Sequence, residues 1–216
     1  GPAFAGGFGG PAALRYLRSL PFVDIANIGL EGHSMGGWTV LAAASALPNG
    51  YRSMVLEGSS TGKPFAADGT PGWPRNVALV FSRFDEFAQI MWGVDRAQDV
   101  PDSPKLQALF GTTAPVIPGR IYGDIATGTA RRLTMPVATH PGDHISHAAV
   151  ADSLGWFGRT LQGGKPRAPT DQIWLTKEFA TGVALVGIVP LLVGVFSLFL
   201  ALPPFAPLRS TPEPRV

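Results

Sequence analysis

The sequence predicts an α/β protein with a mostly parallel sheet flanked by helices, followed by one transmembrane helix. Two features support this prediction. Short apolar runs with strand character alternate with helical segments over most of the chain, and such alternation is typical of parallel sheets. A long, uncharged apolar run then follows near the C-terminus, and it has the length of a membrane-spanning helix.

The composition limits the classes of function. The chain has 216 residues, of which 45% are hydrophobic, so it can bury one sizeable core. Only 15% of the residues are charged and the net charge is +2. We therefore expect no basic patch and no nucleic-acid partner. There is no cysteine, which excludes thiol catalysis, disulfides and cysteine metal sites.

The first elements in chain order are a helix, a strand and a second helix. Apolar residues at positions 13, 14, 17 and 20 lie on one helical face, with Pro11 in the first turn and Pro21 just past the end. Residues 27–31 are predicted as a short buried strand. Residues 38–47 form an Ala/Leu-rich helix, and the Pro-Asn-Gly sequence that follows ends it.

The middle and end of the domain continue the alternation. A Gly/Pro/Ser-rich loop and an irregular segment interrupt it, and Pro136 shifts the last expected strand toward a sheet edge because proline cannot donate to a ladder. The expected elements are strands at 52–57, 76–81 and 131–139, helices at 87–94, 103–110 and 146–161, a loop at 58–75 and an irregular segment at 112–128.

The apolar run near the C-terminus is predicted to cross a membrane. No charged residue occurs from Phe179 to Leu208, and residues 183–202 are long enough to span a hydrocarbon core of ~30 Å. A buried core helix is the alternative, but this run is hydrophobic on every side. Pro190 would kink the helix, which membrane helices tolerate.

Residues 32–37, Gly-His-Ser-Met-Gly-Gly, form the motif with the clearest chemical meaning. They lie between the expected strand and helix, so the chain must turn sharply at Ser34 and leaves room only for small neighbours at Gly32 and Gly36. Such a nucleophile elbow lifts the serine hydroxyl out of the sheet. It also aims a helix N-terminus at the hydroxyl, where the Met35 N–H can donate to an oxyanion.

A serine hydroxyl needs two further groups to act as a nucleophile. A histidine must take its proton, and a carboxylate must orient that histidine and stabilise the imidazolium. Along this chain the order serine, acid, histidine fits the loop ends of successive parallel strands, where such groups converge.

The segment GLEGHSMGGW, an aspartate shortly after a later strand and a histidine-bearing loop before a final amphipathic helix together resemble the α/β-hydrolase superfamily. The resemblance covers about residues 11–161 and is to the esterase, lipase and dienelactone-hydrolase-like branch, most of all to bacterial membrane-attached hydrolases. It implies that Ser34 is the nucleophile, Asp85 the acid and a histidine of the 140–147 loop the base. No cofactor is implied.

The acid has several rivals. Asp85 follows its strand by four residues, close to the usual spacing of the superfamily. Glu57 also ends a strand, as the acid does in a minority of the superfamily, and Glu86 adjoins Asp85. Asp124 and Asp143 lie too near the base loop to be first choices.

The base stays open between two histidines. His140 follows a proline by four residues, and His144 repeats the pattern four residues later, nearer the final helix. His147 is expected in the first turn of that helix and is the least favoured. His33, beside the nucleophile, is not expected to be the base because adjacent elbow residues point away from each other. The spacing of His140, His144 and Asp143 matches no metal motif, so no metal is expected.

One departure from the superfamily leads to an expectation about activity. A complete α/β hydrolase has several strands before the elbow, and one of their loops supplies the second oxyanion donor. Only 33 residues precede Ser34 here. We therefore expect a fragment that lacks the N-terminal strands, with little or no ester turnover of its own, since one missing donor typically costs ~10²–10³ in turnover.

The sequence thus predicts a membrane-anchored serine hydrolase that cleaves a carboxylic ester or related acyl bond. Its expected partners are a small-molecule or lipid-like ester and a membrane. Two alternatives remain, a non-catalytic hydrolase-like module of a multi-pass membrane protein and a peptidase of the same fold. The expected organisation is a partial hydrolase domain at 1–162, a linker at 163–178, a transmembrane helix at 179–208 and a polar tail at 209–216.

Overall fold

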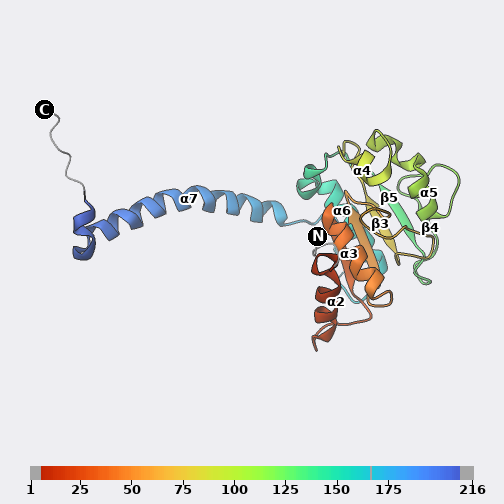
Figure 1. Ribbon diagram of the computed structural model, residues 1–216, viewed down its shortest axis with the longest axis horizontal. Helices are drawn as coiled ribbons and strands as arrows, with labels where there is room; N and C mark the ends of the chain where they lie inside the picture. The colour runs from red at the N-terminus through yellow and green to blue at the C-terminus, as the bar shows by residue number, and fades with distance from the viewer. Residues whose placement is uncertain (1–5, 166, 210–216) are drawn as a thin grey trace. The chain divides into compact units, whose positions relative to one another are not determined.

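The computed structural model describes residues 6–165 and 167–209 of the chain (Figure 1). The chain divides into two compact units, Gly1–Asp171 and Gln172–Val216. The first unit is an α/β fold and the second is helical. Apart from Arg209, the polar tail expected at the C-terminus lies outside the described residues.

The first unit has a five-stranded sheet with helices packed against it. Its strands are β1 (Gly29–His33), β2 (Ser53–Glu57), β3 (Val77–Val80), β4 (Ile121–Tyr122) and β5 (Arg131–Thr134). Its α-helices are α2 (Gly10–Ser19), α3 (Met35–Ala46), α4 (Ala88–Trp92), α5 (Pro104–Phe110) and α6 (His147–Thr160). The 3₁₀ turns are η1 (Gly7–Gly9), η2 (Ala97–Asp102) and η3 (Pro141–Ile145).

Local sequence explains where several helices begin and end. Pro11 lies in the first turn of α2, where its missing N–H costs nothing. The side chain of Ser103 caps α5 by accepting the Leu106 N–H, and that of Ser146 caps α6 by accepting the Ala149 N–H. Gly111 ends α5 in the left-handed conformation.

The sheet order is β1-β2-β3-β5-β4, and all pairs are parallel except β4 with β5. The register places His33 opposite Glu57, Glu57 opposite Val80, and Val80 opposite Thr134. The four parallel strands therefore end at the same level, and the loops that follow them meet at one edge of the sheet.

The sheet differs from the prediction at its last strand. β5 is an internal strand, because the antiparallel β4 covers its outer side with Ile121 opposite Arg132. Pro136 does not force β5 to the edge, since the strand ends at Thr134. β4 lies within the segment that was expected to be irregular.

Two apolar clusters cover the two faces of the sheet. Met54, Leu56 and Leu79 point to one face and pack with residues of α2, α3, α4 and α5 in the larger cluster. Val55 and the residues that alternate with these pack on the other face against α6, whose Trp156 is fully buried. The arrangement is a sheet between helical layers (Figure 1).

The second unit consists of α7 (Trp174–Ala201) and the 3₁₀ turn η4 (Pro203–Leu208). α7 has 28 residues, or about 42 Å at 1.5 Å per residue, and its apolar side chains are exposed on all sides. Among the described residues it is the one helix long and apolar enough to cross a membrane. It begins within the expected linker, so Lys177 and Glu178 belong to its first turns.

Candidate active site

Ser34 lies in the tight turn between β1 and α3, with φ 54° and ψ −121°. A positive φ with this ψ is rare and strained for a residue other than glycine. Two main-chain hydrogen bonds hold it: the Ser34 N–H donates to the Glu57 carbonyl at 2.9 Å, and the Gly37 N–H donates to the Ser34 carbonyl at 3.0 Å. The turn thus has the form expected of an elbow.

The glycines of the elbow have different reasons to be small. A Cβ on Gly32 would lie 2.2 Å from the Gly36 carbonyl oxygen, so β1 and α3 approach too closely for a side chain there. A Cβ on Gly36 would meet nothing within 4 Å, which contradicts the expectation that space is short at that position. The close contact is instead at Gly37, where a Cβ would lie 2.2 Å from Ser59 Oγ.

α3 begins directly after Ser34. The Met35 N–H is therefore in the first helical turn, where amides have no intrahelical acceptor and the helix dipole is positive. Met35 as a residue is about half exposed (51%). This N–H is available to an oxyanion formed at Ser34.

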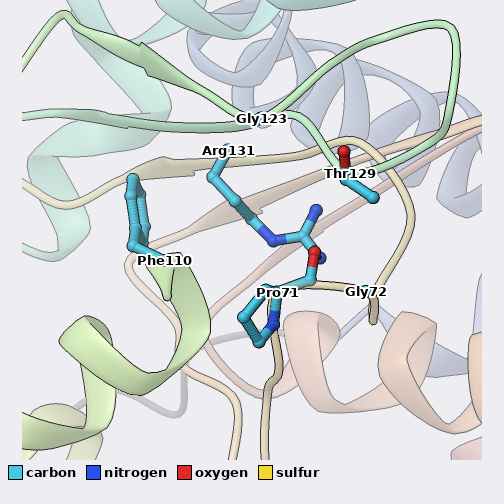
Figure 2. A pocket seen from close by; sticks show the side chains of 6 residues that line it. All are labelled: Pro71, Gly72, Phe110, Gly123, Thr129 and Arg131. Carbon is cyan, nitrogen blue, oxygen red and sulfur yellow. The ribbon is translucent and has the colours of Figure 1, made fainter. Parts of the chain in front are cut away.

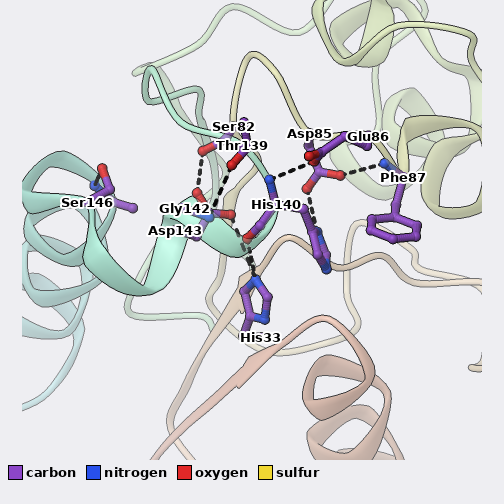
Figure 3. Close-up of polar contacts among 11 residues, drawn as sticks. His33, Ser82, Asp85, Glu86, Phe87, Thr139, His140, Gly142, Asp143 and Ser146 are labelled. Carbon is purple, nitrogen blue, oxygen red and sulfur yellow. Dashed lines mark hydrogen bonds and ion pairs between the residues drawn. The ribbon is translucent and has the colours of Figure 1, made fainter.

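Asp85 and His140 form a buried pair at the carboxyl edge of the sheet (Figure 3). The His140 Nδ1–H donates to Asp85 Oδ2 at 2.8 Å, and the other carboxylate oxygen accepts the Phe87 N–H at 2.8 Å. Burial raises the pKa of Asp85, and the hydrogen bond from His140 lowers it in part. With Nδ1 engaged, the second ring nitrogen of His140 is the one left for proton transfer.

Residues around His140 fix its position. Its own N–H donates to Glu86 Oε2 at 2.9 Å, and the Phe87 ring packs edge-on at 4.6 Å. Gly58, with φ +52°, lies directly beneath, because a Cβ there would be 2.9 Å from His140 Nδ1 and 3.1 Å from His33 Nε2. Glycine is needed at this position for both conformation and space.

The remaining candidates lie elsewhere. His144 is exposed, with its ring 4.1 Å from that of His33. The Asp85 carboxylate, which a base would need, is hydrogen-bonded to His140 instead. His147 is exposed in the first turn of α6. Asp124 lies in the loop between β4 and β5, where it accepts the Ala126 N–H at 2.6 Å.

Glu57 is not placed to orient the base. Its side chain is buried on the α6 side of the sheet, where its hydrogen-bond partner is Glu31. Burial, Glu31 and Asp143 together raise its pKa to about 8, so the group is mostly protonated at neutral pH. Glu57 contributes to the candidate site only through its main-chain carbonyl, which accepts the Ser34 N–H.

A further set of polar contacts, which the sequence did not predict, lies beside the Asp85–His140 pair. Asp143 is fully buried, its Oδ1 accepts the Ser82 hydroxyl, and its Oδ2 lies 4.0 Å from His33 Nε2 (Figure 3). Burial raises the pKa of Asp143 to about 6. His33 Nε2–H donates to the His140 carbonyl at 3.0 Å. The only sign of these contacts in the sequence was that His33 adjoins Ser34 and that Asp143 adjoins His144, both of which were candidate catalytic residues.

Two cavities lie apart from these residues. One of about 300 Å³ is bordered by Arg131, whose buried guanidinium donates to the Thr70 and Pro71 carbonyls at 2.9 Å (Figure 2). The other, of about 900 Å³, lies beside the C-terminal end of α6. Neither is lined by Ser34 or by the Asp85–His140 pair. Within residues 6–165 and 167–209 no group of His, Asp and Glu side chains is arranged to hold a metal ion.

Comparisons with protein-family models, curated proteins and solved structures found no match for this chain. Its class is therefore defined by the fold and the site. It is an α/β protein with a mostly parallel sheet. At the carboxyl edge of that sheet are a serine in a strained turn and a buried aspartate–histidine pair.

Proposed function

We propose that this protein is a membrane-anchored serine hydrolase that cleaves a carboxylic ester or a related acyl bond. The observation that carries the proposal is the buried hydrogen bond between His140 and Asp85, at the same sheet edge as Ser34. This is the donor–acceptor relation that a general base needs to hold its tautomer. The α/β-hydrolase resemblance of the sequence is consistent with it.

The proposed reaction has two halves. Ser34 Oγ bonds to the acyl carbon while its proton passes to His140 Nε2, and the Met35 N–H stabilises the oxyanion. The carbonyl re-forms, the bond to the leaving group breaks, and His140 returns the proton to the departing alcohol. Water, deprotonated by His140, then attacks the acyl carbon of the acyl-enzyme. The bond between that carbon and Ser34 Oγ breaks, His140 returns the proton to Ser34 Oγ, and the acid is released. Asp85 stays ionised and orients the imidazole throughout.

The strain at Ser34 favours catalysis over the alternative of a non-catalytic module. Holding a non-glycine residue in this conformation costs roughly 1–3 kcal/mol, and a binding module has no evident use for a serine presented in this way. The peptidase alternative uses the same residues, so the site does not separate it from an esterase. Peptide and ester substrates compared on the same preparation distinguish the two.

The anchoring half of the proposal is supported by α7. Among the described residues of the second unit there is no apolar cluster against which the exposed apolar side chains of α7 could pack. A helix of this length and composition is stable in a hydrocarbon layer, where all its main-chain groups are bonded internally.

Covalent labelling tests the proposed function. The full-length protein in detergent micelles is treated with a fluorophosphonate probe, and the adduct is located by mass spectrometry. We expect modification of Ser34, no modification in Ser34→Ala, and a labelling rate roughly 10³-fold or more lower in His140→Ala. His144→Ala is the matched control and should label at a rate close to that of wild type. Wild-type protein that gives no Ser34 adduct would refute the proposal.

A further inference from the structure

We propose that Asp143, Ser82 and His33 form a positioning network that holds the three catalytic loops in register. The inference rests on the proposed function, because it assigns roles relative to Ser34, Asp85 and His140. None of the three residues is assigned a contact with the reacting atoms, so they act as positioning residues.

Each member of the network comes from the same segment as one catalytic residue. His33 immediately precedes Ser34 at the end of β1. Ser82 begins the loop that carries Asp85, and its carbonyl accepts the Asp85 N–H at 3.1 Å. Asp143 is in η3, and its N–H donates to the carbonyl of Thr139, the residue before His140, at 3.2 Å.

Asp143 is the centre of the network. One of its oxygens accepts the Ser82 hydroxyl, which joins the base loop to the acid loop. The other is 4.0 Å from His33 Nε2, which joins the base loop to the elbow. Figure 3 shows the Asp143 carboxylate between Ser82 and His33, to one side of His140. A single side chain thus contacts or faces all three segments.

His33 adds a direct restraint on the base. Its Nε2–H donates to the His140 carbonyl at 3.0 Å, and the two rings are 4.6 Å apart. Burial lowers the pKa of His33 to about 4, so its ring is neutral at physiological pH. A neutral ring has one N–H, and this geometry places it on Nε2, toward the His140 carbonyl.

Stability alone does not account for Asp143. Its side chain is fully buried, and Oδ2 has no hydrogen-bond partner among the described residues. A carboxylate in such a place is costly, and an apolar residue of similar size is often as stable or more so. We therefore infer that Asp143 serves to fix the relative positions of the three loops. Catalysis is sensitive to those positions, because a displacement of about 1 Å can cost ~10² in rate.

The test compares two substitutions at Asp143 in the full chain in detergent micelles. Asp143→Ala removes both contacts, and we expect the rate of Ser34 labelling by a fluorophosphonate to fall at least 10-fold. Asp143→Asn keeps an oxygen for the Ser82 hydroxyl, and we expect its rate within about threefold of wild type. Asp152→Ala, which removes a partly buried carboxylate on α6, is the matched control and should label at the wild-type rate.

A spectroscopic readout separates positioning from packing. The Nδ1 proton shared by His140 and Asp85 should give a far-downfield ¹H resonance, identified by its absence in His140→Ala. We expect Asp143→Ala to shift or broaden it and Asp143→Asn to retain it. Ser82→Ala, a milder change, provides the same test if Asp143→Ala fails to fold.

Two results would overturn the inference alone. One is a wild-type labelling rate in both Asp143→Ala and Ser82→Ala. The other is an equal loss of labelling in Asp143→Ala and Asp143→Asn with the downfield resonance unchanged, which would mean that Asp143 only packs. Absence of labelling in wild-type protein would instead refute the proposed function, and this inference would fail with it.

Discussion

At the scale of single residues, the candidate site depends on main-chain positions as much as on side chains. Ser34 keeps its positive φ because the Glu57 carbonyl accepts its N–H and Gly32 lets α3 come close. Gly58 lies between two imidazole rings that would both clash with a side chain. The geometry of the candidate site is thus set by glycines and main-chain amides that have no reactive groups themselves.

Gly58→Ala is the sharpest residue-scale test of this dependence. The new Cβ would press on His140 Nδ1, the atom that binds Asp85, and on His33 Nε2. We expect Ser34 labelling to fall by roughly 10² or more, because the imidazole is displaced. The positive φ also costs about 1–2 kcal/mol of folding stability.

Gly93→Ala is the matched control for this experiment. Gly93 also has a positive φ, +74°, but a Cβ there meets nothing within 4 Å. It should therefore lose a similar amount of stability in a thermal melt and keep the wild-type labelling rate. Equal labelling by the two variants would show that Gly58 does not position the base.

The sequence alone could not decide whether His140 or His144 pairs with Asp85. Both histidines lie on one loop, and their spacing from the preceding strand fits either assignment. The short η3 turn decides which ring reaches Asp85, and such turns have no periodic sequence signal. Asp143 was not favoured as the acid because it lies close to the candidate base in sequence. The same closeness allows it to contact Ser82 and to face His33.

At the scale of elements, the α6 face of the sheet is unusually polar. Glu57 of β2 and Glu31 of β1 are hydrogen-bonded there, and burial raises the pKa of both. Asp143 in η3 and Asp152 and Ser153 on α6 also interact with this pair. His33 lies opposite Glu57 in the strand register, and Arg132 on β5 is paired with Asp152. A proton shared by the two glutamates lets the face remain buried under α6.

This arrangement predicts a pH dependence of stability. The pKa of Glu57 is about 8 in the folded protein and near 4.5 in the unfolded chain. The folded state therefore binds the proton more tightly, so stability is full below about pH 4.5 and declines as pH rises to about 8. We expect wild type to lose roughly 2–4 kcal/mol between pH 5 and pH 8.5.

Glu57→Gln should remove most of this pH dependence. The amide has similar shape and cannot ionise, so unfolding followed by circular dichroism in micelles should give nearly equal stabilities at the two pH values. Glu178→Gln in α7 is the control and should retain the wild-type decline. A wild-type protein equally stable at pH 5 and 8.5 would contradict the assignment.

Element boundaries show which physical signals a sequence carries. The alternation of strands and helices was readable because each element has its own hydrophobic period. β4 has only two residues, too few for any period, and it exists because its neighbour β5 offers a free edge. The effect of Pro136 depended on where β5 ends, which is set by pairing with β3 and not by local sequence.

At the scale of the whole molecule, the chain contains two units whose surfaces differ in polarity. The first buries its apolar residues on both faces of a sheet, while the second exposes them along α7. The apolar run was the easiest feature to predict, because its length and lack of charge need no tertiary context. The start of α7 was less predictable, since the charged residues of its first turns resemble a linker.

The membrane proposal predicts the effect of charges placed in the middle of α7. Arginine at the centre of a membrane helix costs about 2.5–3.5 kcal/mol per residue. The double variant Val189→Arg/Leu192→Arg should therefore make insertion of α7 into the membrane much less favourable. We expect wild-type protein to stay in the membrane fraction after alkaline carbonate extraction and the double variant to be released. Leu202→Arg, at the end of the helix where arginine can reach the interface, should stay bound.

The same double variant tests whether the two units are independent. The first unit has its own apolar clusters, and every residue of the candidate site belongs to it. Loss of membrane insertion should therefore leave the environment of Ser34 unchanged, and fluorophosphonate labelling in micelles should remain within about twofold of wild type. If release from the membrane also abolished labelling in micelles, α7 would have to contribute to the catalytic fold, and the description of two self-contained units would be wrong. Retention of the double variant in the membrane fraction would instead refute α7 as the anchor.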